Sequence, residues 1–152
     1  MYYMQSIPMN KMNLKKILVP LDGSENSIRG LEHAISLAKL ADASIVGTHV
    51  SYVPGNLANP RQGFITQELV KEAEGYLDTA KKQCDENNIE FTSEIIPGTP
   101  STGIVEFAHN ANNKINLIVI GTRGLSSAKE SFLGSVSHHV VHKSNVPVLL
   151  VK

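Results

Sequence analysis

The residues best suited to chemistry lie in one stretch of the chain, between Gly121 and Ser137. Two residues separate Gly121 from Gly124, and nine separate Gly124 from Gly134. Phosphate groups bind where backbone N–H groups approach closely, where hydroxyls donate and where a helix begins. Glycines allow the close approach because they lack a Cβ atom. Hydroxyl groups come from Thr122, Ser126, Ser127, Ser135 and Ser137, and positive charge comes from Arg123 and Lys129. The stretch predicts a polyphosphate site; the alternative is that the glycines end a strand and the serines cap a helix.

A second polar group follows the first predicted strand, in the segment 20–24 of sequence Pro-Leu-Asp-Gly-Ser. Gly23 permits a sharp turn, and Ser24 is a preferred residue type for capping the next helix. In an open parallel sheet, ligands bind beyond the carboxyl ends of the strands, where the strand order reverses. Asp22 is therefore expected at the rim of the sheet, where such a ligand would bind.

The elements that must position these residues alternate between strands and helices. Short apolar runs rich in β-branched residues predict five strands, at Lys16–Leu21, Ser44–Val50, Glu90–Ile96, Leu117–Ile120 and Val146–Val151. Between them, apolar residues recur at helical spacing, and the fourth helix is expected just after the glycine-rich stretch. This alternation predicts one α/β domain: an open five-stranded parallel sheet with right-handed crossovers and helices on both faces.

The last predicted strand has the features of a sheet edge. Pro147 has no N–H to donate, so it belongs at a strand start or on an edge. A bare edge of sequence Val-Pro-Val-Leu-Leu-Val, with no charge before Lys152, would invite aggregation. Pairing of Val146–Val151 with a second copy would cover it and give a two-fold homodimer. The alternative is that a helix covers this edge.

The overall composition excludes several classes of protein. The chain has 152 residues, with 14 basic and 14 acidic side chains, so it has no excess positive charge for nucleic acid or an anionic membrane. Its apolar runs are too short to span a bilayer. The single cysteine, Cys84, cannot form an internal disulfide, which together with the lack of a signal sequence favours a cytoplasmic location.

Other motifs are weaker. Neither a Walker-type phosphate loop nor a Gly-x-Gly-x2-Gly dinucleotide motif is present. His138 and His142 have a spacing that suits a metal, but without further ligands we interpret them as incidental. Cys84 lies on the apolar stripe of the second helix, which favours a buried, inert thiol. His49 is of interest because it precedes Val50 at a strand end. The connection Ser51–Gly63 is long enough to act as a lid.

Two motifs far apart in the chain resemble the universal stress protein family. The spacing Gly121-x2-Gly124-x9-Gly134-Ser135 is similar to the ATP-binding motif of that family, and residues 16–24 resemble its opening strand and turn. Residues 144–151 resemble its closing strand, so the likeness runs from about residue 13 to residue 152. Residues 1–12 lie outside it and are expected to form a disordered or extended leader to a domain at 13–152.

The resemblance implies a Rossmann-like sheet of strand order 3-2-1-4-5, with the nucleotide between strands 1 and 4 and a homodimer formed through the last strands. It implies ATP as the ligand, or AMP or ADP with the same adenosine contacts. Pro20 and Val50 would border the adenine, and Asp22 would lie near the ribose or a nucleotide-bound Mg²⁺. The implied ligand-binding residues are Pro20, Leu21, Asp22, Val50, Gly121, Thr122, Arg123, Gly124, Leu125, Ser126, Ser127, Gly134, Ser135, Val136 and Ser137.

Three functions are compatible with such a site. The first is a signalling module of the stress response, a homodimeric switch in which ATP changes the surface shown to an unknown protein partner. The second is a slow Mg-dependent ATPase or autophosphorylating enzyme, for which Asp22 is the candidate catalytic group and Ser126 or Ser127 the acceptor. The third is a scaffold or chaperone-like dimer with a vestigial site. We favour the first, because phosphate-binding elements are present and a catalytic constellation is not.

Overall fold

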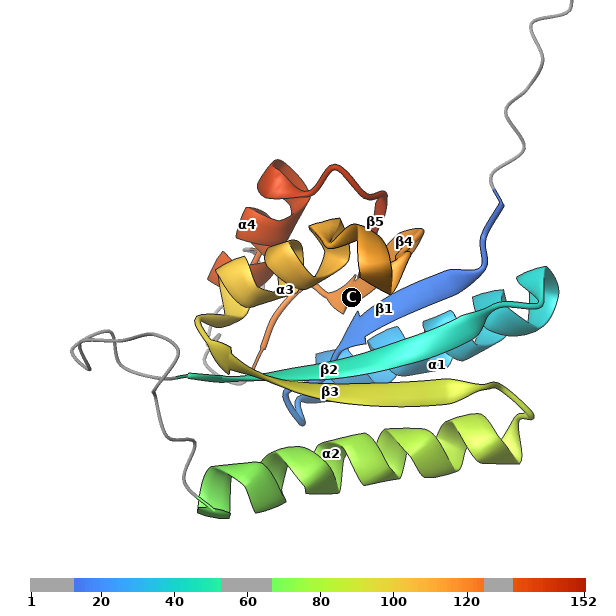
Figure 1. Ribbon diagram of the computed structural model, residues 1–152, viewed down its shortest axis with the longest axis horizontal. Helices are drawn as coiled ribbons and strands as arrows, with labels where there is room; N and C mark the ends of the chain where they lie inside the picture. Colours follow the sequence, from blue (N-terminus) through green and yellow to red (C-terminus); the bar gives the residue numbers. More distant parts are fainter. Residues whose placement is uncertain (1–12, 53–66, 125–132) are drawn as a thin grey trace, which may run out of the picture.

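The computed structural model describes residues 13–52, 67–124 and 133–152. Strands and helices alternate through these ranges, as the sequence predicts (Figure 1). In chain order they are β1 (Lys16–Pro20), α1 (Glu25–Ala41), β2 (Ser44–Tyr52), α2 (Gln67–Glu86), β3 (Phe91–Gly98), α3 (Pro100–His109), the 3-10 helix η1 (Ala111–Asn113), β4 (Leu117–Gly121), α4 (Ser135–Lys143) and β5 (Val148–Val151). Three predicted features lie outside the described residues: the leader 1–12, most of the possible lid, and Leu125, Ser126, Ser127 and Lys129.

The strands form one parallel sheet of order β3-β2-β1-β4-β5, which confirms the strand order implied by the resemblance. Strand β1 is central, with Ile17 and Leu18 paired to β4 on one side and Lys16–Pro20 paired to β2 on the other. The order reverses at β1, because β2 and β3 add to one side of it and β4 and β5 to the other. The carboxyl ends of β1 and β4 therefore flank the place where open parallel sheets bind ligands.

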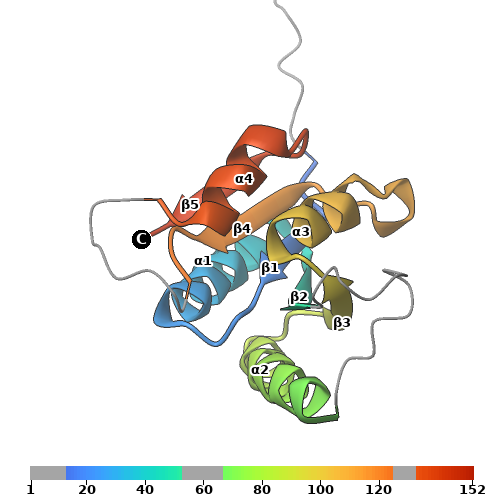
Figure 2. The ribbon, with the colours of Figure 1, turned by 90° about the vertical axis from the view of Figure 1, so that its left-hand side faces the viewer.

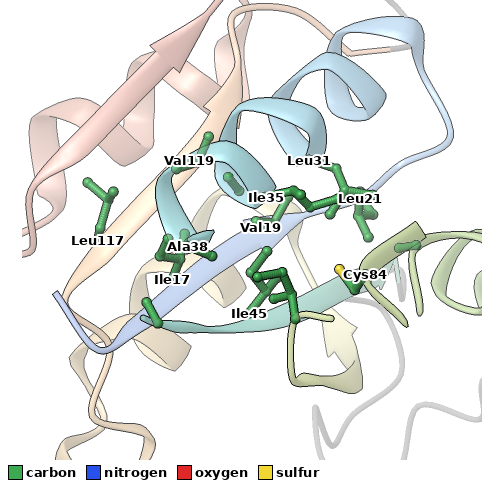
Figure 3. Packing of buried hydrophobic residues seen from close by; sticks show 14 of the residues in the cluster. Ile17, Val19, Leu21, Leu31, Ile35, Ala38, Ile45, Cys84, Leu117 and Val119 are labelled. Carbon is green, nitrogen blue, oxygen red and sulfur yellow. The ribbon is translucent and has the colours of Figure 1, made fainter. Parts of the chain in front are cut away.

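Helices α1 and α2 cover one face of the sheet (Figure 2). The packing around α1 is shown in Figure 3, where its small and branched residues meet the central strands. Ala34 and Ala38 are 0% exposed, which brings the α1 backbone close to Ile17 and Val19 of β1. Leu77, Ala80 and Cys84 extend the same core from α2. The main role of this face is to anchor the sheet, and the start of α1 is the part of it that lies next to the segment after β1.

Helices α3 and α4 cover the opposite face, where the core is Leu18, Val46, Ile104, Val105, Ala108, Ile115, Ile118, Ile120 and Val140. Val50 and Val136 are partly buried against this core. Both lie near the ends of their elements that approach the switch point, so the second core leads directly into the candidate site. No helix in the described ranges is long and apolar enough to cross a membrane.

The start of α1 forms as the sequence predicts. Gly23 adopts a positive φ of 81°, the conformation that favours glycine, and the turn it makes is covered by the ring of Tyr76. Ser24 is the N-cap, and its hydroxyl accepts a hydrogen bond of 3.2 Å from the Ser27 N–H. The turn fixes the chain direction immediately after Asp22.

Strand β5 is an edge strand, as predicted, but it is shorter than the predicted range Val146–Val151. Pro147 precedes the strand and still contributes its carbonyl, which accepts a hydrogen bond of 2.9 Å from the Ile118 N–H. Because proline donates no hydrogen bond, it fits at this strand start, which is one of the two positions expected for it. The edge is formed by Val148–Val151 alone.

Candidate ligand-binding site

A cavity of about 450 Å³ lies at the carboxyl ends of β1, β2 and β4. Its wall combines the exits of these strands with the first turns of α3 and α4. Its described lining residues are Pro20, Leu21, Asp22, Ser27, Thr48, His49, Val50, Pro100, Ile104, Ile120, Gly121, Arg123, Gly124, Leu133, Gly134, Ser135, Val136 and Ser137. The topology thus brings together segments as far apart in the sequence as Pro20 and Ser137, at the position that the strand order predicts.

The wall has an apolar part and a polar part. Pro20, Val50 and Ile104 contribute carbon surface, and so do other members of the α3 and α4 core. The segments after β1 and β4 contribute two residues of opposite charge, Asp22 and Arg123. A flat apolar ring with an anionic substituent would match both parts.

The carboxylate of Asp22 is held in place through one of its oxygens. Its Oδ1 accepts hydrogen bonds from the Ser24 N–H at 2.9 Å and from the Ser24 hydroxyl at 2.5 Å. Its Oδ2 lies toward Gly124, where an added Cβ atom would be 2.6 Å away from it. Gly124 therefore leaves room for an oriented carboxylate at the cavity wall, and Oδ2 is the oxygen that a ligand or cation would meet.

The structure corrects the reason given for two of the glycines. We expected Gly121 and Gly134 to let a phosphate approach, but their missing Cβ atoms face the protein itself. A Cβ at Gly121 would lie 2.8 Å from the backbone of Asn26 in the first turn of α1. A Cβ at Gly134 would lie 3.2 Å from the Thr122 carbonyl oxygen, which already accepts a 2.7 Å bond from the Gly134 N–H. These glycines let chain segments pack closely, and the packing in turn shapes the cavity.

Thr122 is placed differently from the expectation that it would bind ligand. It is 9% exposed and is absent from the described lining of the cavity. Its N–H donates to the Val151 carbonyl at 2.8 Å, and its carbonyl accepts from Gly134 and from the Ser137 hydroxyl. Thr122 thus joins β4, β5 and α4. Ser137 lines the cavity, but its single hydroxyl hydrogen is already used within the protein.

The first turn of α4 faces the cavity with its backbone donors. Gly134 is the N-cap, and Ser135 and Val136 line the cavity. The first N–H groups of a helix have no partner inside it, and they lie at the positive end of its dipole. With the Arg123 side chain on the same wall, this turn can bind an anion.

His49, which the sequence marked only by its position before Val50, holds the chain just after β1. Its Nδ1 lies 2.7 Å from the Leu21 carbonyl oxygen, and its ring packs against Tyr76 with centroids 5.6 Å apart. The Tyr76 hydroxyl donates to Glu72 at 2.7 Å, and this bond is the main reason that the pKa of Tyr76 is raised. These contacts fix the backbone before Asp22.

Sequence reasoning missed several lining residues, namely Ser27, Thr48, Pro100, Ile104, Ile120 and Leu133. Ile104 of α3, Ile120 of β4 and Leu133 before α4 are apolar, and nothing in their local sequence separates a cavity wall from a core. The alternation of β2 offered one signal: Thr48 shares a strand face with Val50, which was predicted to line the site.

Two side interpretations can be compared with the structure. Cys84 is 0% exposed, which confirms that it is buried. His138 and His142 lie with ring centroids 4.4 Å apart on α4. Within residues 13–52, 67–124 and 133–152, no three His, Cys, Asp or Glu side chains gather as a metal site would require.

Comparison with known proteins finds a consistent set of relatives. The model of the universal stress protein family matches residues 13–152. The chain is 37% identical to universal stress protein MJ0531 of Methanocaldococcus jannaschii, over 99% of this chain and 90% of that protein. Its fold is similar to that of protein MJ0577 of the same organism, with a TM-score of 0.77 and 29% identity, covering 91% and 95% of the two chains. A universal stress protein in complex with cAMP has a TM-score of 0.68 and 25% identity, with coverages of 91% and 96%.

Proposed function

Since this chain belongs to the universal stress protein family, we propose that its cavity binds an adenine nucleotide, with ATP as the preferred ligand. The observation that carries the proposal is the two-part wall at the switch point. An apolar part around Pro20 and Val50 suits a purine, and the first turn of α4 with Arg123 suits phosphates. The similar protein bound to cAMP supports the same ligand class.

We place the base in the apolar part of the wall and the phosphates at the start of α4. Ser135 and Val136 would donate backbone N–H groups to phosphate oxygens, and Arg123 would add a charge-assisted contact. Oδ2 of Asp22 would either accept a hydrogen bond from a ribose hydroxyl or coordinate a nucleotide-bound Mg²⁺, since Oδ1 is occupied by Ser24. AMP and ADP would share the adenosine contacts.

The residues of the cavity also fit a nucleotide-bound Mg²⁺. The ion prefers oxygen ligands and keeps several waters, so one protein carboxylate together with phosphate oxygens is a sufficient site. Oδ2 of Asp22 is a carboxylate oxygen that faces the cavity beside Gly124. Bound there, the ion would neutralise part of the phosphate charge; the protein's own contribution is the orientation of Asp22 by Ser24.

We further propose that the protein acts in the cytoplasm as a homodimeric switch of the stress response. Strand β5 forms one edge of the sheet, and Leu149 on it is 37% exposed. The residue that follows the strand, Lys152, is tied to α1, because Arg29 Nε donates to its carbonyl at 2.9 Å. The Thr122 N–H donates to the Val151 carbonyl, so β5 is hydrogen-bonded to the segment that leads from β4 into the site. Nucleotide binding and pairing of the β5 edge would influence each other through this hydrogen bond.

Thermal unfolding with and without excess Mg-ATP tests the binding proposal. A ligand at about 100 times its Kd stabilises the folded state by about 2.7 kcal/mol, which is several degrees in Tm for a domain of this size. We expect a larger shift with ATP than with GTP, and a measurable shift with AMP. The absence of a shift with every nucleotide would contradict the proposal and favour a scaffold with a vestigial site.

The variant Asp22→Asn sharpens this test. The amide oxygen can still accept from Ser24, while the charge that faces a cation is removed. We expect Mg-ATP to bind about tenfold more weakly, with the Tm of the free protein little changed. Asp85→Asn, in the exposed pair with Lys81 on α2, is the matched control and should leave binding unaltered.

A further inference from the structure

Strand β2 contains two buried hydroxyls that have no hydrogen-bond partner within the described part of the chain. They are Oγ1 of Thr48 and Oγ of Ser51. Thr48 is 0% exposed and Ser51 is 2% exposed. Burying an unpaired hydroxyl is unfavourable, and folded proteins rarely do so without a structural or functional reason. Each hydroxyl therefore calls for an explanation.

The two hydroxyls lie on opposite faces of the sheet. Successive side chains of a strand alternate between its faces. Val46 and Val50 pack in the α3 and α4 core, so Thr48 lies on that face, whereas Ser51 shares the face of Ile45 and the α1 and α2 core. Thr48 lines the cavity, and Ser51 is not among the lining residues. The Thr48 hydroxyl is thus the one placed at the wall of the proposed ligand site.

The protein groups next to Thr48 do not offer it a partner. Its register neighbours are Pro20 in β1, which has no N–H group, and Glu94 in β3, which is exposed and makes no hydrogen bond to the Thr48 hydroxyl. The N–H of Leu21 is already donated to the Thr48 carbonyl at 2.7 Å. Val50 and Ile104, which line the same cavity, present only carbon in their side chains. The hydroxyl is therefore a single polar group in an otherwise apolar part of the wall.

We propose that the Thr48 hydroxyl recognises the purine base by hydrogen bonding to its edge, an inference that rests on the proposed nucleotide function. A threonine hydroxyl has one donor hydrogen and two acceptor lone pairs. It can donate to a ring nitrogen of adenine or accept from the exocyclic amino group. Because Thr48 has no exposed surface, neighbouring side chains must shift slightly as the base enters, and the hydrogen bond then forms out of contact with water. Thr48 is accordingly a specificity residue of the site.

The variant Thr48→Val isolates the hydroxyl, because valine has nearly the same shape and replaces it with a methyl group. Calorimetric titration with AMP should show about three- to tenfold weaker binding than to the wild type, the size expected for one neutral hydrogen bond. Without nucleotide, the Tm of Thr48→Val should be equal or higher, since an unpaired buried hydroxyl is lost. Thr48→Ser keeps the hydroxyl and should retain most of the affinity. Ser51→Ala removes the other unpaired hydroxyl and should bind AMP as the wild type does.

Base analogues then test whether the partner is the purine. Purine riboside monophosphate and the deaza analogues of AMP each lack one polar group of the base. For one of them, the wild type should lose affinity relative to AMP, while Thr48→Val should show no such loss. If Thr48→Val binds AMP as tightly as the wild type, the inference is wrong and the proposed function stands. Equal losses for both proteins with every analogue, or a lowered Tm of Thr48→Val, would also overturn it. A wild type that binds no adenine nucleotide would overturn both proposals.

Discussion

At the scale of single residues, Asp22 shows how one side chain is divided between folding and binding. One oxygen is used by the turn before α1, through two hydrogen bonds from Ser24. The other faces the cavity beside Gly124. The division holds the carboxylate in one orientation, which is the condition for a well-placed ligand group.

Gly124→Ala should therefore weaken nucleotide binding through Asp22. The new Cβ would lie 2.6 Å from Oδ2, so the carboxylate must turn away from its bound position. We expect at least a tenfold loss of affinity for Mg-ATP in a calorimetric titration, about 1.4 kcal/mol. In an Asp22→Ala background the clash is absent, so the same substitution should cost no further affinity. A full additional loss in that background would contradict the assigned contact.

Gly75→Ala is the matched control for this glycine substitution. Gly75 is inside α2, and nothing lies within 4 Å of an added Cβ atom. Alanine is favoured over glycine in a helix by about 0.5–1 kcal/mol. We expect this variant to be slightly more stable in urea unfolding and to bind nucleotide as the wild type does.

Cys84 makes a prediction about reactivity and pH. Burial is the main cause that raises the pKa of its thiol from 9.0 to about 11. At pH 8 the native thiol should therefore react with Ellman's reagent only as fast as the protein opens. The raised pKa stabilises the folded state fully below pH 9, and this stabilisation is lost as the pH rises towards 11. Rapid labelling of the native protein, or a Cys84→Ala variant with the same alkaline loss of stability, would contradict this assignment.

The site residues differ in how far the sequence could predict them. Asp22, Arg123 and Gly124 were found because their types and spacing signal a ligand directly. The role of Thr122 was missed, since its carbonyl meets Ser137 only after β4, β5 and α4 have packed. Ile104 of α3 belongs to the core and also lines the cavity, because the cavity borders this core. Such distinctions depend on tertiary contacts that a local pattern does not contain.

At the scale of elements, the N-terminus of α1 links helix stability to the site. Ser24→Ala removes the side-chain acceptor for the Ser27 N–H, so we expect a loss of about 1 kcal/mol and a Tm lower by about 3 °C. Ser36→Ala is the control within the same helix, because its hydroxyl only returns to the Glu32 carbonyl on the exposed surface. Calorimetric unfolding gives the Tm of both variants. A Tm of Ser24→Ala equal to that of Ser36→Ala would contradict the capping role.

Strand β5 should determine the state of association. Leu149 is 37% exposed on this edge, and we propose that a second copy covers it. Leu149→Lys places a charge in the proposed interface and should convert dimers to monomers in sedimentation experiments. Leu40→Lys, at a residue of α1 that is 86% exposed, should leave association unchanged. A wild type that sediments as a monomer would contradict the dimer.

Element types and order were predictable because each strand is a short apolar run and each helix has a clear apolar stripe. The boundaries of the elements were less predictable. Strand β5 begins at Val148, two residues later than predicted, since Pro147 cannot donate to the ladder although its carbonyl accepts. Strand β2 continues to Tyr52, two residues beyond the prediction, because β3 pairs with it as far as Gly98. Strand ends are set by the partner strand, which the local sequence does not reveal.

At the scale of the whole molecule, the strand order explains why a cavity forms at this place. Strands β1 and β4 are neighbours although a hundred residues separate their starts, and their exits diverge to opposite faces of the sheet. The helix after β1 starts on the face of α1 and α2, and the helix after β4 on that of α3 and α4. The resulting gap at the switch point is lined by Asp22 and by the first turn of α4. We propose that an adenine nucleotide binds there.

Titration of isotope-labelled protein with Mg-ATP, followed by backbone amide NMR, tests that claim most directly. We predict saturable shifts centred on the amides of Ser135, Val136, Arg123 and Asp22, with smaller shifts at Val50. The amides of Asn87 and Asn88, at the opposite end of the sheet, should not move. Saturable shifts that gather elsewhere, with these cavity amides unmoved, would contradict the assigned site, and the absence of any shift would contradict nucleotide binding itself.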